Sequence, residues 1–162
     1  MIHDHRGHGD SIKAEEDLGY FYDSTASYIV EDLHQVTQVI KQEYPNLPVY
    51  LFGHSMGSMV VRCYLKKYDN EINKLIVCGA PSKNIGASFG IFLAKIIGKF
   101  KGDKYRSKLM QKLTFSSYPK KFEKEKEDEN CWISSEEENK EKYNQDKKCG
   151  YVFTLNGFQN LY

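Results

Sequence analysis

Apolar residues recur at helical spacing in two segments of the first half of the chain. In residues 27–44, four aliphatic side chains follow one another at steps of four, three and four: Ile29, Leu33, Val36 and Ile40. In residues 56–68 the same period passes through Met56, Met59, Val60, Cys63 and Tyr64. Because this spacing places the apolar side chains on one face of a helix, it predicts two amphipathic helices.

Short continuous apolar runs follow each of these helices. The runs are "PVYLFG" at residues 48–53 and "NKLIVCGAP" at residues 73–81. Their length and their content of β-branched and aromatic residues predict strands, and we expect these strands to be buried on both faces. Helices that alternate with strands over short connections indicate βαβ units, a parallel sheet with flanking helices and the α/β fold class.

The pattern changes after residue 81. Residues 82–149 alternate lysine- and glutamate-rich stretches with single hydrophobic residues, which predicts a small helical subdomain with a solvated charged face. The most apolar part of this region is residues 85–100. From residue 150 the chain is apolar again, as expected for a return to the core. The predicted organisation is therefore 1–81, 82–149 and 150–162.

Composition narrows the function classes. The 162 residues include 23 basic and 22 acidic side chains, a formal net charge of +1, so nothing predicts nucleic-acid binding. No uncharged apolar run reaches the roughly 18 residues that a membrane span needs, and no signal peptide is expected. The four cysteines are far apart and form no C-x-x-C pair. We therefore expect reduced thiols and a cytoplasmic protein.

The strongest chemical signal is "GHSMG", residues 53–57, between a predicted strand and a predicted helix. In G-x-S-x-G the serine, here Ser55, occupies a strained turn that presents its hydroxyl above the sheet. Gly53 and Gly57 are expected to leave room for close approach of the backbone. The N–H of Met56, at the start of the helix, is suited to stabilising an oxyanion. His54 adjoins Ser55 on the turn, points elsewhere and is a poor candidate for a base.

The chain opens with "MIHDHRGHGDS", which contains three histidines and two aspartates between residues 3 and 10. Metal-ligand spacing is approached there but not met, because Gly7 stands where a further ligand would be needed. We therefore expect no metal and no cofactor, and a turn that uses the backbone freedom of Gly7 and Gly9.

Together the two motifs resemble the α/β-hydrolases, in the branch of monoacylglycerol lipases, lysophospholipases and serine aminopeptidases. The serine motif is similar to their nucleophile elbow. The opening segment is similar to their D-x-R-G-H-G-x-S loop, here Asp4, Arg6, Gly7, His8, Gly9 and Ser11. The segment around Trp132 resembles the end of their cap, although Cys131 stands where members usually have Asp. Residues 82–149 are then expected to be a helical cap inserted into a hydrolase core.

The resemblance implies a role for each candidate residue. Ser55 is the expected nucleophile and Met56 N–H the oxyanion donor, while Asp4 and Arg6 brace a loop that lines the site. His8 is expected to be part of the wall of the site rather than its base.

The triad of this fold runs Ser, Asp or Glu, then His along the chain, and no histidine follows His54. We therefore expect the acid and base to lie outside the 162 residues, the core segment to be incomplete at both ends, and the isolated chain to be inactive.

Several functions stay open at this point. The expected reaction is cleavage of a lysophospholipid or monoacylglycerol ester through an acyl-enzyme on Ser55, and the apolar residues 85–100 favour acyl substrates. Ordinary packing of a cap helix explains that stretch equally well. A serine aminopeptidase is the alternative within the family, and a catalytically incomplete binding or scaffold module is the alternative from another class. The expected partner is a small-molecule or lipid ester, with transient membrane contact through the cap; the oligomeric state is left open.

Overall fold

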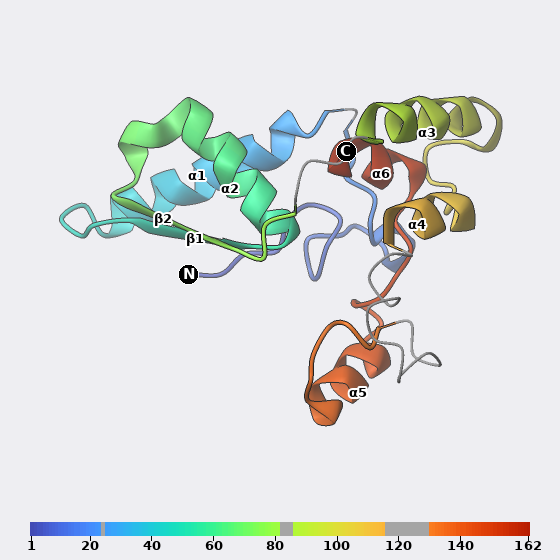
Figure 1. Ribbon diagram of the computed structural model, residues 1–162. Coiled ribbons are helices and arrows are strands. Elements are labelled where there is room, and N and C mark those ends of the chain that lie inside the picture. The colour runs from blue at the N-terminus through green and yellow to red at the C-terminus, as the bar shows by residue number, and fades with distance from the viewer. Residues whose placement is uncertain (24, 82–85, 116–129) are drawn as a thin grey trace. The chain divides into compact units, whose positions relative to one another are not determined.

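The computed structural model describes residues 1–23, 25–81, 86–115 and 130–162. The chain divides into two compact units (Figure 1). The first unit comprises residues 1–24 together with residues 87–160 and Tyr162, and the second comprises residues 25–86 with Leu161. These two units do not test the predicted division into core, cap and return segment, which stays a prediction.

The second unit contains the predicted alternation of helix and strand. It consists of α1 (Ser27–Glu43), β1 (Tyr50–His54), α2 (Met56–Tyr68), the 3₁₀ turn η2 (Asp69–Glu71) and β2 (Lys74–Cys78). The strands pair in parallel, with a register that runs from Tyr50 opposite Lys74 to His54 opposite Cys78. Both helices, both strands and their parallel pairing are therefore confirmed, and the fold class is α/β.

The expectation that both strands are buried on both faces is wrong for this structure. Tyr50, Phe52 and Ile76 have exposed fractions of 56, 60 and 50%. Within the second unit, α2 packs along the strand pair, and α1 packs on α2 rather than on the opposite face of the sheet (Figure 1). One layer of helices covers one face of a sheet, so the apolar residues that face away from α2 stay exposed.

The α1–α2 interface is the buried centre of the second unit. Its buried apolar side chains come from both helices: Ile29, Val30, Leu33, Val60, Val61 and Tyr64. Two of the four residues that predicted α1, Ile29 and Leu33, are in this group. The amphipathic pattern of α1 therefore reports packing against α2.

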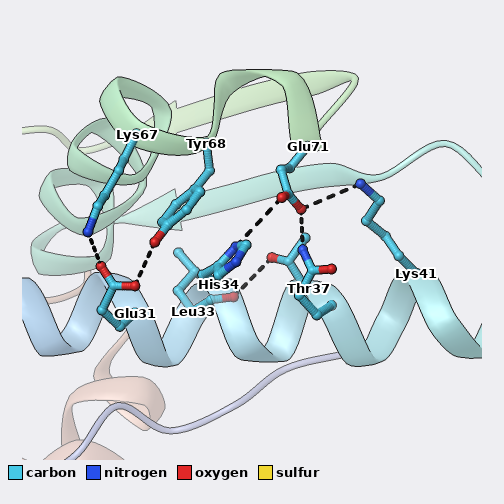
Figure 2. A network of polar contacts seen from close by, with 9 residues as sticks. Glu31, Leu33, His34, Thr37, Lys41, Lys67, Tyr68 and Glu71 are labelled. Atoms are coloured by element: carbon cyan, nitrogen blue, oxygen red, sulfur yellow. Dashed lines mark hydrogen bonds and ion pairs between the residues drawn. The ribbon is translucent and has the colours of Figure 1, made fainter.

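Polar contacts border this interface (Figure 2). Glu31 of α1 pairs with Lys67 and accepts a 2.6 Å hydrogen bond from the hydroxyl of Tyr68, both on α2. The hydrogen bond from Lys67 is the main cause that lowers the pKa of Glu31. The ring of His34 stacks on that of Tyr68 at 3.8 Å and 4°. At the other end, Lys41 lies 3.4 Å from the Glu71 carboxylate.

The first unit is helical in its described residues. It contains η1 (Glu15–Asp17), α3 (Ala87–Lys101), α4 (Lys108–Phe115), α5 (Glu137–Gln145) and all but the last residue of α6 (Leu155–Leu161). The helical character predicted for residues 82–149 is confirmed where the structure describes them; residues 82–85 and 116–129 lie outside the described part. In that described part, no helix has both the length and the apolar character needed to cross a membrane.

The segment after residue 150 is buried, as its apolar sequence predicts. Leu155 and Phe158 of α6 pack with Ala94 of α3 and Met110 of α4, and none of the four exposes any surface. Gly157 lies so close to the N-terminal segment that a Cβ there would be 2.1 Å from the carbonyl oxygen of Gly19. Residues distant in sequence therefore share this core.

Arg106 joins three backbone segments of the first unit. Its guanidinium donates to the carbonyl oxygens of Glu16 and Leu18, at 3.0 and 2.7 Å, and to that of Val152. Its backbone also bridges to Thr154. A planar group with five donors is suited to several carbonyls at once, which the point charge of a lysine is not.

We expect Arg106→Met to destabilise the first unit by about 2–4 kcal/mol, because it leaves partly buried carbonyls without their charged donor. The measurement is urea unfolding together with hydrogen exchange of the Leu18 and Thr154 amides. Lys108→Met, at an exposed position nearby, is the matched control. An Arg106 variant as stable as this control would contradict the role assigned to the guanidinium.

Candidate active site

Ser55 lies at the sharp turn between β1 and α2 that its motif predicts. Its backbone has φ 52° and ψ −117°, one of only two positive φ values among described residues other than glycine. It is the N-cap residue of α2, its side chain makes no capping hydrogen bond, and it is exposed. The backbone part of the prediction is confirmed. The role of Ser55 as nucleophile stays a prediction.

Hydrogen bonds on both sides hold the Ser55 backbone. Its N–H donates to the carbonyl oxygen of Cys78 at 3.0 Å, which continues the pairing of β1 with β2 beyond the last strand residue. Its carbonyl oxygen accepts from the Ser58 N–H at 3.0 Å and from the Ser58 hydroxyl at 2.5 Å. The side chain of Ser58 is fully buried.

Gly53 is required by close packing, whereas Gly57 is not. A Cβ on Gly53 would lie 2.5 Å from the carbonyl oxygen of Gly57 and 2.7 Å from a methyl of Val61. A Cβ on Gly57 would meet no described atom within 4 Å. The room expected at Gly53 is confirmed. The same expectation at Gly57 stays a prediction, since its carbonyl makes the close approach to Gly53 while its own Cα meets no described neighbour.

Met56 is the first residue of α2. The first four N–H groups of a helix have no acceptor inside it, and the Met56 N–H is one of these. His54 lies on the other side of Ser55 in sequence. Its ring is against the turn at Gly79, with Nε2 3.0 Å from where a Cβ on Gly79 would be. The oxyanion role of Met56 stays a prediction.

Sequence reasoning missed two residues at this turn. Ser58 is three residues after Ser55, the spacing at which polar side chains recur in helix N-terminal turns, and this was the available signal. Gly79 directly follows β2 and has φ 57°. Since carboxyl ends of parallel strands meet at one edge of a sheet, its place after the second predicted strand was also a signal.

The opening loop belongs to the first unit and is built as a chain of tight turns. Gly7 and Gly9 have φ 73° and 51°. A Cβ on Gly7 would be 2.2 Å from the carbonyl oxygen of Tyr20, and one on Gly9 would be 2.1 Å from the Asp4 carboxylate. That carboxylate accepts from the Asp10 N–H at 2.9 Å. Asp4 therefore braces the loop, as expected. The bracing expected of Arg6 stays a prediction, and so does the proximity of this loop to Ser55.

His8 lies among aromatic rings. The ring centroids of Phe21, Phe153 and Tyr151 are 5.3, 5.6 and 6.0 Å from its own. Its Nδ1–H donates to the carbonyl oxygen of Arg6 at 3.0 Å. Burial lowers the pKa of His8, and the Arg6 carbonyl and the Asp4 charge oppose this more weakly. Across the described residues, no group of three or more His, Cys, Asp or Glu side chains is arranged to hold a metal ion.

Replacing Gly53 by Ala is expected to destabilise the second unit by about 1–3 kcal/mol, because the new methyl overlaps the Gly57 carbonyl. Gly57→Ala is the matched variant in the same motif. It is expected to be neutral or to stabilise by up to about 1 kcal/mol, since Ala is the better helix former. Urea unfolding of the two variants measures the difference. Equal loss in both would contradict the steric argument.

We expect the pH dependence of the free energy of unfolding to reflect the protonation of His8. The folded pKa of His8 lies below the ordinary 6.5. As the pH falls, the unfolded chain therefore binds a proton at His8 before the folded chain does. Stability is then fully present above about pH 6.5 and falls at lower pH, by up to about 1.4 kcal/mol per pH unit until the folded pKa is reached. His8→Asn should flatten this slope. Parallel slopes for wild type and His8→Asn would rule out His8 as the cause.

Comparisons with known proteins bear on the chain as a whole. Residues 1–162 match the family described as "Serine aminopeptidase, S33", a family of α/β-hydrolases. A monoacylglycerol lipase of Mycolicibacterium smegmatis is 33% identical over 98 residues, which cover 59% of this chain and 33% of that protein. A proline iminopeptidase of Chitinophaga pinensis is 31% identical over 97 residues, which cover 60% of this chain and 30% of that protein.

Among solved structures, a highly thermostable carboxyl esterase from Bacillus coagulans, in complex with glycerol, is similar with a TM-score of 0.83 and 26% identity. The match covers 98% of this chain and 52% of the esterase. The chain thus spans about half of that structure and about a third of the two curated relatives. The match of the family over all 162 residues identifies the chain as a member of the S33 family of α/β-hydrolases, a family of serine hydrolases that includes esterases and lipases.

Proposed function

We propose that this chain carries the nucleophile of a serine hydrolase that cleaves a carboxylic ester of monoacylglycerol or lysophospholipid type. The observation that supports the proposal most is the exposed Ser55 at φ 52° on the N-terminus of α2. A serine hydroxyl held on such a turn, free of capping bonds, is accessible to an acyl carbon.

In the proposed reaction, Ser55 Oγ forms a bond to the acyl carbon while a base takes the hydroxyl proton. The carbonyl electron pair moves to oxygen, where the Met56 N–H donates to it. The pair then re-forms the carbonyl, the ester C–O bond breaks, and the alcohol leaves with the proton held by the base. Water hydrolyses the acyl-enzyme by the same steps and regenerates Ser55.

We propose that the base and the acid are supplied from outside these 162 residues. All five histidines lie at or before residue 54, whereas the resemblance places the histidine last in the triad. Residues 82–149 are proposed to be the cap of this hydrolase, and its site is proposed to include the loop from Asp4 to Gly9. The four free thiols are consistent with a proposed cytoplasmic location.

A peptidase is the second candidate within the family, since one relative of comparable similarity is named a proline iminopeptidase. Ester and amide cleavage use the same nucleophile and oxyanion donor, and the residues around Ser55 do not distinguish them. A module that binds without catalysis is the candidate from another class.

The isolated chain is expected to hydrolyse p-nitrophenyl esters at close to the uncatalysed rate, with no difference between wild type and Ser55→Ala. A serine without its base is a weak nucleophile, and loss of triad members leaves at most about 10³–10⁴-fold catalysis over water. Turnover of about 1–10³ per second that requires Ser55 would contradict this. The base would then be one of the five histidines, and His8→Asn would test the first candidate.

A chimera tests the enzyme against the binding module. In it, this chain replaces the matching segment of the Bacillus coagulans esterase, which supplies the remaining residues. We expect ester hydrolysis that is lost by about 10³-fold or more in Ser55→Ala. Parallel assays with a monoacylglycerol and a prolyl amide separate lipase from peptidase. A folded chimera inactive on both substrates would favour the binding module.

A further inference from the structure

The peptide group between Ser55 and Met56 joins an acceptor to a donor. Its carbonyl oxygen belongs to Ser55 and its N–H to Met56, and because the group is planar and trans, the two point in opposite directions. The N–H is the first of α2 and has no acceptor inside that helix. Whatever fixes the direction of the Ser55 carbonyl therefore also fixes the direction of the Met56 N–H.

The side chain of Ser58 holds this carbonyl. Its hydroxyl donates to the Ser55 carbonyl oxygen at 2.5 Å, in addition to the Ser58 N–H at 3.0 Å. Nearly every residue type would supply the N–H at this position, so the hydroxyl is the contribution of the serine itself. Ser58 exposes no surface, and a hydrogen bond left unmade at a buried position is costly. The hydroxyl is therefore a firm hold on the carbonyl.

The strained backbone of Ser55 needs such a hold. At φ 52° the allowed region for a residue other than glycine has ψ near about 47°, whereas Ser55 has ψ −117°. Relaxation of ψ to that region would turn the Ser55–Met56 peptide group by about 160°, and the Met56 N–H would then point to the opposite side. The preceding peptide group is held separately, by the Ser55 N–H that donates to the Cys78 carbonyl oxygen. The strain therefore acts on the peptide group that Ser58 holds.

We propose that Ser58 is a positioning residue, whose hydroxyl sets the direction of the Met56 N–H through the carbonyl of the shared peptide group. Ser58 acts through Met56 and does not itself contact the substrate. In the proposed hydrolase this N–H donates to the oxyanion, and such a donor is effective only when it is aimed at the developing charge. The consequence for catalysis rests on the proposed function, whereas the direction of the N–H does not.

The direct test is the residual dipolar coupling of the Met56 N–H, measured by NMR on the full chain, since this coupling reports the direction of the bond. In Ser58→Ala we expect the coupling to change or to average towards zero, while the couplings of Val60 and Val61, further along α2, stay as in wild type. Ser58→Cys fills the space of the serine but has a weaker donor. We expect it to change the Met56 coupling in the same direction as Ser58→Ala.

The matched control is Thr37→Val on α1. The hydroxyl of Thr37 is also buried and donates to a backbone carbonyl oxygen of its own helix, that of Leu33, at 2.9 Å. The substitution removes the same kind of hydrogen bond from the same unit, but from a different helix. We expect a loss of stability in urea comparable to that of Ser58→Ala, and no change in the Met56 coupling.

Kinetics of the chimera with the Bacillus coagulans esterase provide the second measurement. Ser58→Ala is expected to lower kcat about tenfold, which is less than the loss of an oxyanion donor itself, and to leave KM unchanged. The reason for this split is that an oxyanion donor acts on the transition state and not on bound substrate. Thr37→Val is expected to leave both constants close to those of wild type.

Three results would overturn the proposal. The first is a Met56 coupling that is the same in wild type and Ser58→Ala. The second is a coupling that changes in Ser58→Ala but not in Ser58→Cys, which would assign the effect to a cavity. The third is an equal fall of kcat in Ser58→Ala and Thr37→Val. A chimera without activity would contradict the proposed function alone, and the dipolar couplings would still decide the role of Ser58.

Discussion

The reversal of the backbone at Ser55 is the constraint on which the candidate site depends. A residue other than glycine at φ 52° is strained by about 1–3 kcal/mol and keeps that conformation only where neighbours enforce it. Here the enforcement comes from both sides of the turn. Cys78 at the end of β2 accepts the Ser55 N–H, and Ser58 in the first turn of α2 donates twice to the Ser55 carbonyl. The turn exists because strand pairing and helix initiation meet at one residue.

Because Ser55 is the N-cap residue of α2, its position depends on how α2 is held by its partner α1. The strand pair is exposed on the side away from α2, so the sheet alone is a weak support. The opposite side of α2 is well packed. Tyr64 is fully buried there, and Glu31 and Glu71 make polar contacts across the interface, as Figure 2 shows. A helix fixed along its length by a second helix has a fixed N-terminus, and Ser55 is the residue at that end.

Local features of the sequence predicted local structure well, because their causes are local. The step of three and four residues predicted α1 and α2, and G-x-S-x-G predicted a strained turn, since strand, glycine and helix start are contiguous there. Contacts between distant segments were not predictable in this way. Arg106 binds carbonyls at Leu18 and Val152, 88 and 46 residues away, and every residue type has a carbonyl, so nothing in the sequence marks the acceptors. Exposure of Phe52 likewise depends on what lies beside β1, not on its own run of apolar residues.

The chemistry of His8 illustrates the same distinction between residue type and surroundings. A histidine that takes a serine proton must become imidazolium in the transition state, and triads stabilise that cation with a carboxylate on Nδ1. In this structure the Nδ1–H donates to a neutral carbonyl, that of Arg6, and the ring is enclosed by Phe21 and Phe153. Burial destabilises the imidazolium more than the carbonyl and the Asp4 charge stabilise it, so the pKa falls. Protonation of His8 is therefore disfavoured by its surroundings. Its expected place in the wall of the site, and not as the base, stays a prediction.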